Sequence, residues 1–222
     1  MTIGMMRVKS IPVSELEKAA RALDDGELVI VPTERWYMIC ADATNLAACE
    51  SIFTSKQRPR SKSLVYIAPS RQVCADLFVM HPEAELLADA FWPGNLAMLL
   101  PWKSTPQADV QQATVGSPAL VTIAPGPLGE LALSSPVPVA ATTVNISGDA
   151  GVDAPGPAIS VQEVHAFLDH TAINAAVILD GGVAPAANHL TIVDCSMPTA
   201  DLTRPGLVHE RALAAVLRRQ LS

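Results

Sequence analysis

Short apolar segments with the character of β-strands alternate with helical patterns along almost the whole chain. Residues 28–31, 64–67 and 119–123 are apolar runs rich in Leu, Val and Ile, which are typical of strands buried on both faces. Apolar residues at helical spacing instead mark the segments near 14–24 and 82–91. This alternation predicts an α/β fold, with a mixed sheet and helices around it.

The remaining elements follow from the same patterns and from helix caps. Asn45, Ser70 and Ser160 each stand before a helical segment, where a side-chain oxygen can accept from the first free backbone N–H groups. Further strands are predicted at 96–100, 137–141, 177–180 and 190–194, and further helices from Asn45, over 70–79, from Ser160 to about 169, and over 205–221.

The chain is predicted to form one domain, 1–222. A Gly- and Pro-rich stretch at 148–158 is expected to be a mobile loop and could link two domains. Both sides of it share one composition, however, and the C-terminal part alone is too small for a good core. Half of the residues are apolar and only 17% are charged, which predicts a sizeable core rather than disorder.

Charge and cysteine content narrow the classes of function. The net charge of −7 argues against a broad grip on nucleic acid, although a local basic patch remains compatible with it. The four cysteines are scattered without a C-x-x-C pair, which predicts reduced core residues of a cytoplasmic protein. No apolar run reaches the roughly 18 residues of a membrane span, so no membrane association is expected.

Several familiar chemistries lack their motifs. The sequence contains no G-x-x-x-x-G-K-[ST] loop, no G-x-G-x-x-G turn and no G-x-S-x-G elbow. The five histidines form no zinc pattern, so no metal ligands are predicted, and each histidine is expected to be a surface or capped side chain.

A short basic run, Lys56-Gln57-Arg58-Pro59, lies between a helical segment and a strand. In an acidic chain, two cations fixed between packed elements could bind a small anion such as a phosphate chain or bicarbonate. A solvated turn is the alternative interpretation of the run taken alone.

Other motifs surround this run in a definite order. They are Pro32-Thr33-Glu34-Arg35-Trp36-Tyr37, Phe91-Trp92-Pro93-Gly94-Asn95-Leu96, Thr142-Thr143-Val144-Asn145-Ile146-Ser147-Gly148, Leu190-Thr191-Ile192-Val193-Asp194 and Thr203-Arg204-Pro205-Gly206. The succession resembles the YrdC-like family, whose motifs are P-T-E-T-x-Y-G-L, K-x-R-P, W-P-G-P-x-T, V-R-x-P, S-A-N-x-S-G, S-T-[IV]-V-D and R-x-G. The resemblance covers about residues 12–210.

The resemblance implies both a fold and a reaction. The fold is a single-domain twisted mixed sheet, flanked by helices around a large concave, positively charged cavity. The best-known members condense L-threonine, bicarbonate and ATP into threonylcarbamoyl-AMP and pyrophosphate, with a divalent ion, Mg²⁺, carried on the nucleotide. A downstream transferase then modifies adenosine 37 of certain tRNAs, and double-stranded RNA binding is a further family theme.

The matching positions supply candidate site residues. Lys56 and Arg58 are expected to be catalytic, by holding phosphate and bicarbonate and stabilising the departing pyrophosphate. The nucleotide-binding candidates are Lys56, Arg58, Thr143, Asn145, Ser147, Thr191 and Arg204. The substrate-binding candidates are Thr33, Arg35, Tyr37 and Thr122. The Trp92-Pro93-Gly94 segment is expected to be a structural turn.

The departures from the family pattern concentrate on the side of the amine substrate. Thr122 stands at the position of the V-R-x-P arginine that binds the carboxylate of threonine, and a hydroxyl cannot replace a bidentate cation. Met38 replaces a glycine, Leu190 replaces a serine, and Asn95 and Ala97 alter W-P-G-P-x-T. One hypothesis is that Arg35, which replaces a threonine, supplies the missing cation from the opposite wall.

Three alternatives therefore remain. The chain could be a carbamoyl-type adenylate synthase that acts on threonine, on another amine or on carbamoyl phosphate in specialised metabolism. It could instead be a non-catalytic module that binds nucleotide or RNA, or a structural partner that has lost the site.

Overall fold

The computed structural model describes residues 8–103, 110, 112–146, 156–171, 173–186 and 188–220. The candidate Ser147 and most of the loop expected at 148–158 lie outside the described residues.

A single mixed sheet runs through the described part of the chain, with the strand order β1-β8-β2-β3-β7-β4-β6-β5-β9-β10. Its strands are β1 (Ser10–Pro12), β2 (Val29–Pro32), β3 (Tyr37–Asp42), β4 (Val65–Ile67), β5 (Leu96–Leu100), β6 (Ala119–Thr122), β7 (Val139–Thr143), β8 (Val177–Asp180), β9 (Thr191–Asp194) and β10 (Asp201–Arg204). β8 lies parallel to β1 and β2, β4 lies parallel to β6, and β5 lies parallel to β9, whereas the other pairs are antiparallel. The predicted α/β class with a mixed sheet is thus confirmed.

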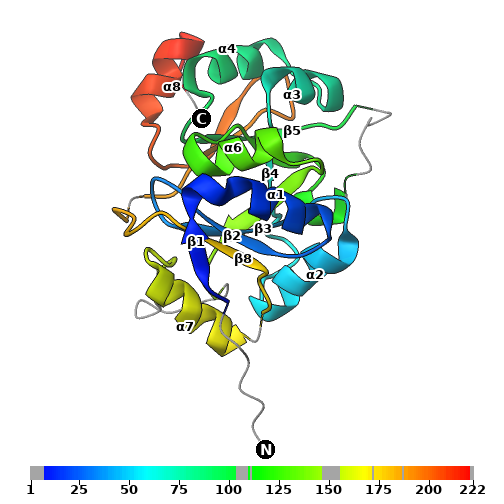
Figure 1. The fold of residues 1–222 in the computed structure, drawn as a ribbon. Helices are drawn as coiled ribbons and strands as arrows, with labels where there is room; N and C mark the ends of the chain where they lie inside the picture. The colour runs from blue at the N-terminus through cyan, green and yellow to red at the C-terminus, as the bar shows by residue number, and fades with distance from the viewer. Residues whose placement is uncertain are drawn as a thin grey trace, which may run out of the picture.

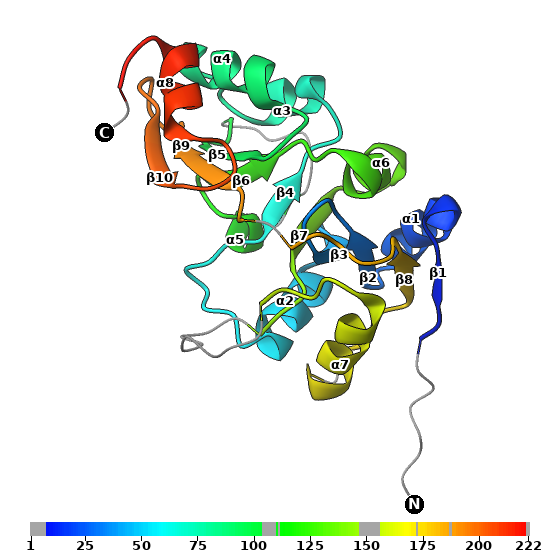
Figure 2. The same cartoon turned by 90° about the vertical axis from the view of Figure 1, so that its left-hand side faces the viewer.

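Helices cover both faces of the sheet. They are α1 (Leu16–Asp24), preceded by a 3-10 turn at Val13–Glu15, α2 (Leu46–Ser55), α3 (Arg71–Leu77), α4 (Pro82–Phe91), α5 (Gln112–Val115), α6 (Gly126–Ser134), α7 (Val161–Thr171) and α8 (Glu210–Leu217). Apolar residues of α1 and α6 pack together over one face. The other apolar cluster includes residues of α2, α3, α4, α7 and α8. In Figures 1 and 2, α3, α4 and α8 gather at one end of the molecule, and α2 and α7 at the other.

Most element boundaries agree with the local sequence signals. The Asn45 side chain accepts from the amide of Ala48, and Ser70 accepts from Val73, so both predicted caps form. The prediction of a helix over 205–221 is wrong at its start, because α8 begins only at Glu210 and the chain before it is irregular. No helix of the described segments is long and apolar enough to cross a bilayer.

Candidate functional site

A cavity of about 680 Å³ opens where segments distant in sequence come together. The polar side chains that line it include those of Arg35, Arg58, Thr143, Asn145, His189 and Arg204. The three arginines come from the loop after β2, the turn after α2, and the end of β10. A space of this size is typical of a small-molecule site rather than of a packing defect.

The turn after α2 separates the two cations of the basic run. Gln57 has a left-handed backbone with φ of 50°, and the amide of Arg58 donates to the carbonyl of Phe53 at 2.8 Å. The amide of Gln57 donates to Thr54 at 3.1 Å, which completes a Schellman helix end. The chain therefore turns sharply between Lys56 and Arg58, and the two side chains have different surroundings.

Lys56 does not line the cavity, which corrects the expectation that it faces the ligand. Its side chain is 0% exposed, and its Nζ donates to the carbonyls of Thr143 and Asn145 and, at 3.2 Å, to the Oδ1 of Asn145. Nζ also lies 5.5 Å from the ring centroid of Phe167. The ammonium group of Lys56 is already hydrogen-bonded to these carbonyl oxygens. Lys56 therefore holds the end of β7 in place and does not reach into the cavity.

Two opposing effects act on the pKa of Lys56. Burial, together with the charge of Arg58, lowers the pKa of Lys56 to about 7. The oxygen acceptors around Nζ favour the charged form and so oppose this shift.

Arg58 lies in the cavity wall. Its Nε donates to the carbonyl of Lys62 at 2.7 Å and its Nη2 donates to the carbonyl of Ser63 at 2.6 Å. Burial and the nearby charge of Arg204 lower the pKa of Arg58 to about 10, so it remains charged at neutral pH. Within the described residues neither arginine forms an ion pair, and two unneutralised cations on one cavity attract an anion.

Thr143 and Asn145, whose carbonyl groups accept from Lys56, are two polar candidates at the same cavity. The hydroxyl of Thr143 donates to the Oδ1 of Asn145 at 2.6 Å, and the Nδ2 of Asn145 donates to the carbonyl of Ile146 at 3.0 Å. Thr143 and Asn145 both line the cavity. The Asn145 amide is therefore pre-oriented by its neighbours.

Arg204 is fixed to the neighbouring strand segment at the edge of the cavity. Its Nε and Nη2 donate to the carbonyl of Leu190 at 3.2 and 2.9 Å, and burial lowers its pKa. Two residues later, Gly206 passes so close to this segment that an added Cβ would lie 2.4 Å from the carbonyl oxygen of His189 and 2.6 Å from the amide nitrogen of Thr191. The glycine of the R-x-G motif is thus required for Arg204 to reach its position.

We expect Gly206→Ala to lower the free energy of unfolding by about 2–4 kcal/mol, because the clashing atoms belong to the backbone and must shift. Urea denaturation would measure the loss. Gly156→Ala is the matched control, since nothing lies within 4 Å of the added Cβ there. Equal stability of the two variants would contradict this account of the close approach.

Two further candidates, Thr191 and Tyr37, are buried and hydrogen-bonded to the backbone, and they do not line the cavity. Thr191 is 0% exposed, and its hydroxyl donates to the carbonyl of Val208 and accepts from the Val208 amide, both at 2.9 Å. Tyr37 is also 0% exposed, and its hydroxyl donates to the carbonyl of Gly182 at 2.7 Å. Neither residue lines either of the cavities at the site, because each hydroxyl joins two parts of the backbone.

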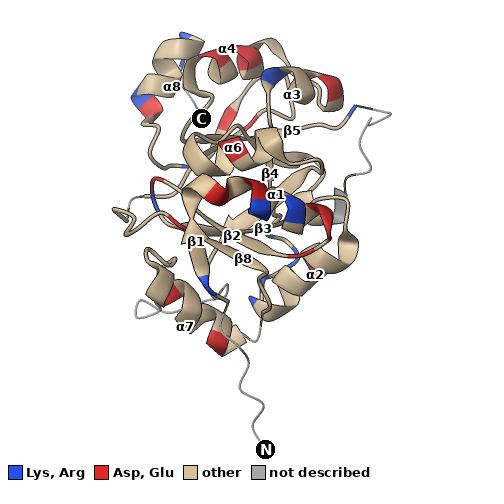
Figure 3. Ribbon diagram, in the orientation of Figure 1, with Lys and Arg blue, Asp and Glu red and all other residues tan. Residues whose placement is uncertain are grey.

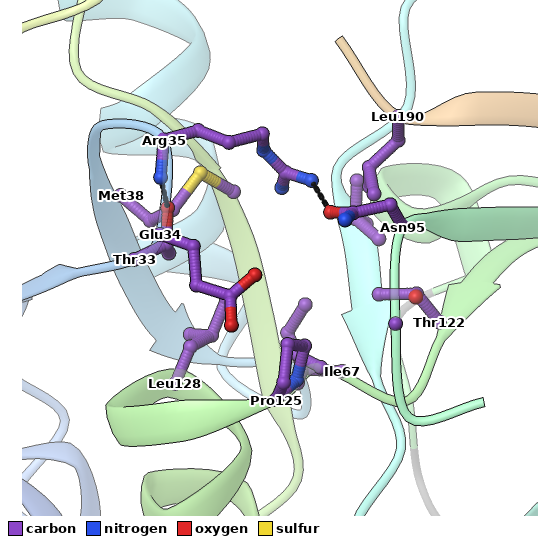
Figure 4. A pocket seen from close by; sticks show the side chains of 13 residues that line it. Thr33, Glu34, Arg35, Met38, Ile67, Asn95, Thr122, Pro125, Leu128 and Leu190 are labelled. Carbon is purple, nitrogen blue, oxygen red and sulfur yellow. Dashed lines mark hydrogen bonds between the residues drawn. The ribbon is translucent and has the colours of Figure 1, made fainter. Parts of the chain in front are cut away.

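A second, small pocket of about 20 Å³ adjoins the large cavity and shares Arg35, Met38, Val65 and Leu190 with it (Figure 4). Thr33 and Thr122 line this pocket, so three of the four substrate-binding candidates lie together. The guanidinium of Arg35 reaches across to the Oδ1 of Asn95, sixty residues further along the chain.

Sequence reasoning missed some cavity residues. His189 was expected to be a surface or capped side chain, yet it lines the large cavity, with its ring centroid 5.0 Å from that of Trp36. Burial and the charges of Arg204 and Arg35 lower the pKa of His189. Its place directly before the S-T-[IV]-V-D-like segment was the signal available. Asn95 was noted only as a departure from the family motif.

Charged residues also occur on the helices away from the cavity. On the face shown in Figure 3, acidic and basic residues are interspersed along α1 and α8. Among the described residues, no group of three or more His, Cys, Asp or Glu side chains could hold a metal ion.

Comparison with known proteins places this geometry in context. The sequence model of the Sua5/YciO/YrdC family, described as telomere recombination, matches residues 21–206. The chain belongs to this family. A Bacillus subtilis member named threonylcarbamoyl-AMP synthase is 33% identical over 207 residues, which cover 91% of this chain and 56% of the relative. A putative threonylcarbamoyl-AMP synthase of Mycobacterium tuberculosis is 30% identical over 200 residues, which cover 90% of this chain and 87% of the relative.

Solved structures of the family share the fold. The crystal structure of P. abyssi Sua5 complexed with L-threonine matches with a TM-score of 0.79 and 28% identity, covering 96% of this chain and 60% of that one. Escherichia coli YciO matches with a TM-score of 0.72 at 16% identity, over 91% of this chain and 97% of that one, which shows likeness of fold alone. The chain thus spans a little over half the length of the B. subtilis and P. abyssi relatives.

Proposed function

We propose that this chain catalyses the ATP-dependent formation of a carbamoyl-type adenylate. The family reaction combines L-threonine, bicarbonate and ATP and releases pyrophosphate. The observation that carries the proposal is the convergence of Arg58, Asn145 and Arg204 on one cavity of about 680 Å³. These residues come from segments far apart in the sequence, and they occupy the matching positions of the family's K-x-R-P, S-A-N and R-x-G motifs.

The chemistry requires a shielded site with positive charge. An amine displaces water from bicarbonate to form a carbamate, and a carbamate oxygen then attacks the α-phosphorus of ATP as pyrophosphate leaves. The carbamate is labile, so the three reactants must meet in one enclosed space. Arg58 and Arg204 would stabilise the charge that develops on the departing pyrophosphate.

The other polar residues would orient the nucleotide and would take no part in the chemical step. Asn145 and Thr143 would donate to or accept from the nucleotide, and Lys56 is a positioning residue that holds both through their backbone. Mg²⁺ would be bound mainly by the phosphates and enter with ATP, since the cavity is lined by cations rather than by a carboxylate cluster.

The product would pass to a downstream transferase that acts on tRNA. Cys40, Cys49, Cys74 and Cys195 are free and buried, which supports a reducing compartment such as the cytoplasm.

Release of pyrophosphate from ATP tests the proposal. The purified chain would be incubated with ATP, Mg²⁺ and bicarbonate, with a panel of amino acids or with carbamoyl phosphate. We expect release that requires either bicarbonate with one class of amine, or carbamoyl phosphate. ATP binding without release in any arm would favour a non-catalytic module, and no ATP binding would favour a chain that has lost the site.

A further inference from the structure

The large cavity has little capacity to accept a proton. Among the described residues that line it there is no Asp, Glu, Cys or Tyr, and its ionisable side chains are three arginines, one lysine and one histidine. Arginine and lysine are ordinarily charged at neutral pH, and the hydroxyls of Ser and Thr do not take up protons there. Within the described part of the wall, His189 is therefore the one group that can act as a base near neutral pH.

The chemistry proposed above needs such a base. When a neutral amine attacks the carbon of bicarbonate, a C–N bond forms and the nitrogen must lose a proton. A C–O bond of the same carbon must then break, and the hydroxyl group needs a proton to leave as water. A group that accepts the first proton and delivers it to the hydroxyl assists both events and is itself regenerated.

The surroundings of His189 hold its ring at the cavity. Its ring centroid lies 5.0 Å from that of Trp36, which is 5% exposed. Its carbonyl accepts from the amide of Leu207 at 3.1 Å, and the carbonyl of the next residue, Leu190, accepts from Arg204. Neither ring nitrogen forms a hydrogen bond with a described residue. The imidazole is thus positioned by its neighbours, and its nitrogens stay available to a substrate.

The nearby charges favour the basic form of the imidazole. Burial and the charges of Arg204, at the end of β10, and of Arg35, in the loop after β2, lower the pKa of His189. Trp36, the ring that contacts it, carries no charge. His189 is therefore mainly neutral at pH 7 and can accept a proton. The same cations disfavour a nearby ammonium group, so an amine in this cavity is held in its reactive neutral form.

Two other titratable groups lie near the cavity but are less suited to this role. Lys56, whose pKa is lowered to about 7, is 0% exposed, and its Nζ is hydrogen-bonded to carbonyl oxygens outside the cavity. Glu34 lines only the small adjoining pocket, and carboxylates are ordinarily much weaker bases than imidazole. Neither group is placed to touch a substrate in the large cavity.

We propose that His189 is a catalytic residue, the general base that takes the proton from the attacking amine and returns it to the hydroxyl that leaves as water. The inference rests on the proposed function and deepens it, because it assigns formation of the carbamate to one side chain. His189 lies directly before the segment that matches S-T-[IV]-V-D and is not itself part of that motif.

Pyrophosphate release by the wild-type chain and by His189→Gln tests this assignment, with ATP, Mg²⁺, bicarbonate and the amine that supports turnover. We expect kcat to fall about 100-fold, as is typical for a lost general base, while the Kd of a non-hydrolysable ATP analogue changes by less than about threefold. Added imidazole should restore part of the lost rate. His170→Gln, on the exposed last turn of α7, is the matched control and should keep full activity.

The pH dependence distinguishes a base from a cationic contact. The ratio of the wild-type rate to the His189→Gln rate cancels the ionisation of bicarbonate and of the amine, which both reactions share. A base acts only in its neutral form, so this ratio should be constant at high pH and fall as the pH drops through the pKa of His189. A ratio that rises at low pH, or a His189→Lys variant as active as the wild type, would make His189 a cationic contact and overturn the inference.

The remaining outcomes separate this inference from the proposed function. Full activity in His189→Gln, including the case in which Glu34→Gln loses activity instead, would overturn the inference alone, as would a loss of ATP affinity as large as the loss of rate. Release that requires carbamoyl phosphate and no amine would also leave the proposed function standing but remove the role of His189. No release in any arm would overturn both. Thermal melting of each variant would show that a lost rate is not due to unfolding.

Discussion

Replacing Lys56 by methionine should lower the free energy of unfolding by about 2–4 kcal/mol and reduce pyrophosphate release at least 100-fold. The loss of the ammonium leaves the buried carbonyls of Thr143 and Asn145 without their donor, and each unsatisfied group costs about 1–3 kcal/mol. The desolvation of the charge that is relieved offsets part of this cost. Activity falls because the Asn145 segment is no longer fixed at the cavity.

Urea denaturation and a pyrophosphate assay on the same preparations would measure both effects. Lys18→Met is the control, because Lys18 is an exposed residue of α1 that pairs with Glu15 on the surface, and such changes usually lie within about 0.5 kcal/mol. A Lys56→Met protein with wild-type stability and nucleotide affinity would refute the role of Lys56 as the support of this segment.

Arg58→Ala should leave the fold almost intact and lower kcat/KM about 10³-fold. Its guanidinium makes two hydrogen bonds to a surface turn but lines the cavity beside Arg204, so most of its effect is on a bound anion. Loss of a charged donor that stabilises the transition state typically costs about 10²–10³ in rate, and weaker ATP binding adds to this.

A neighbouring arginine provides the matched control for this prediction. Arg60 lies two residues away, but its guanidinium pairs with Glu50 and stacks 4.7 Å from the ring centroid of Phe53, outside the cavity. Arg60→Ala is expected to change kcat/KM less than threefold. Similar losses in the two variants would mean that the effect of Arg58 is a general one of surface charge.

The elements of the fold could be predicted where local signals determine them. The caps Asn45 and Ser70 and the apolar runs of β5 and β8 identify their elements within a residue or two. β3 was not predicted, although its fully buried segment is an apolar run like those of the predicted strands, because its first residue, Tyr37, was read as part of the Pro32–Tyr37 motif. The strand order depends on pairing between distant segments, which local patterns do not encode.

Several residues of the site could be predicted from the sequence, but the directions in which their side chains point could not. Motif order identified Arg58, Asn145 and Arg204, which share one cavity. The direction of Lys56 depends on the left-handed turn at Gln57 and on carbonyls almost ninety residues away. The contact between Arg35 and Asn95 likewise arises only when two distant loops meet.

The most direct test of the central claim is a crystal structure of the chain with a non-hydrolysable ATP analogue and Mg²⁺. Our account predicts the triphosphate in the large cavity, with phosphate oxygens within hydrogen-bonding distance of Arg58 and Arg204 and the Asn145 side chain in contact with the nucleotide. A nucleotide bound elsewhere, or in this cavity without contact to either arginine, would contradict it.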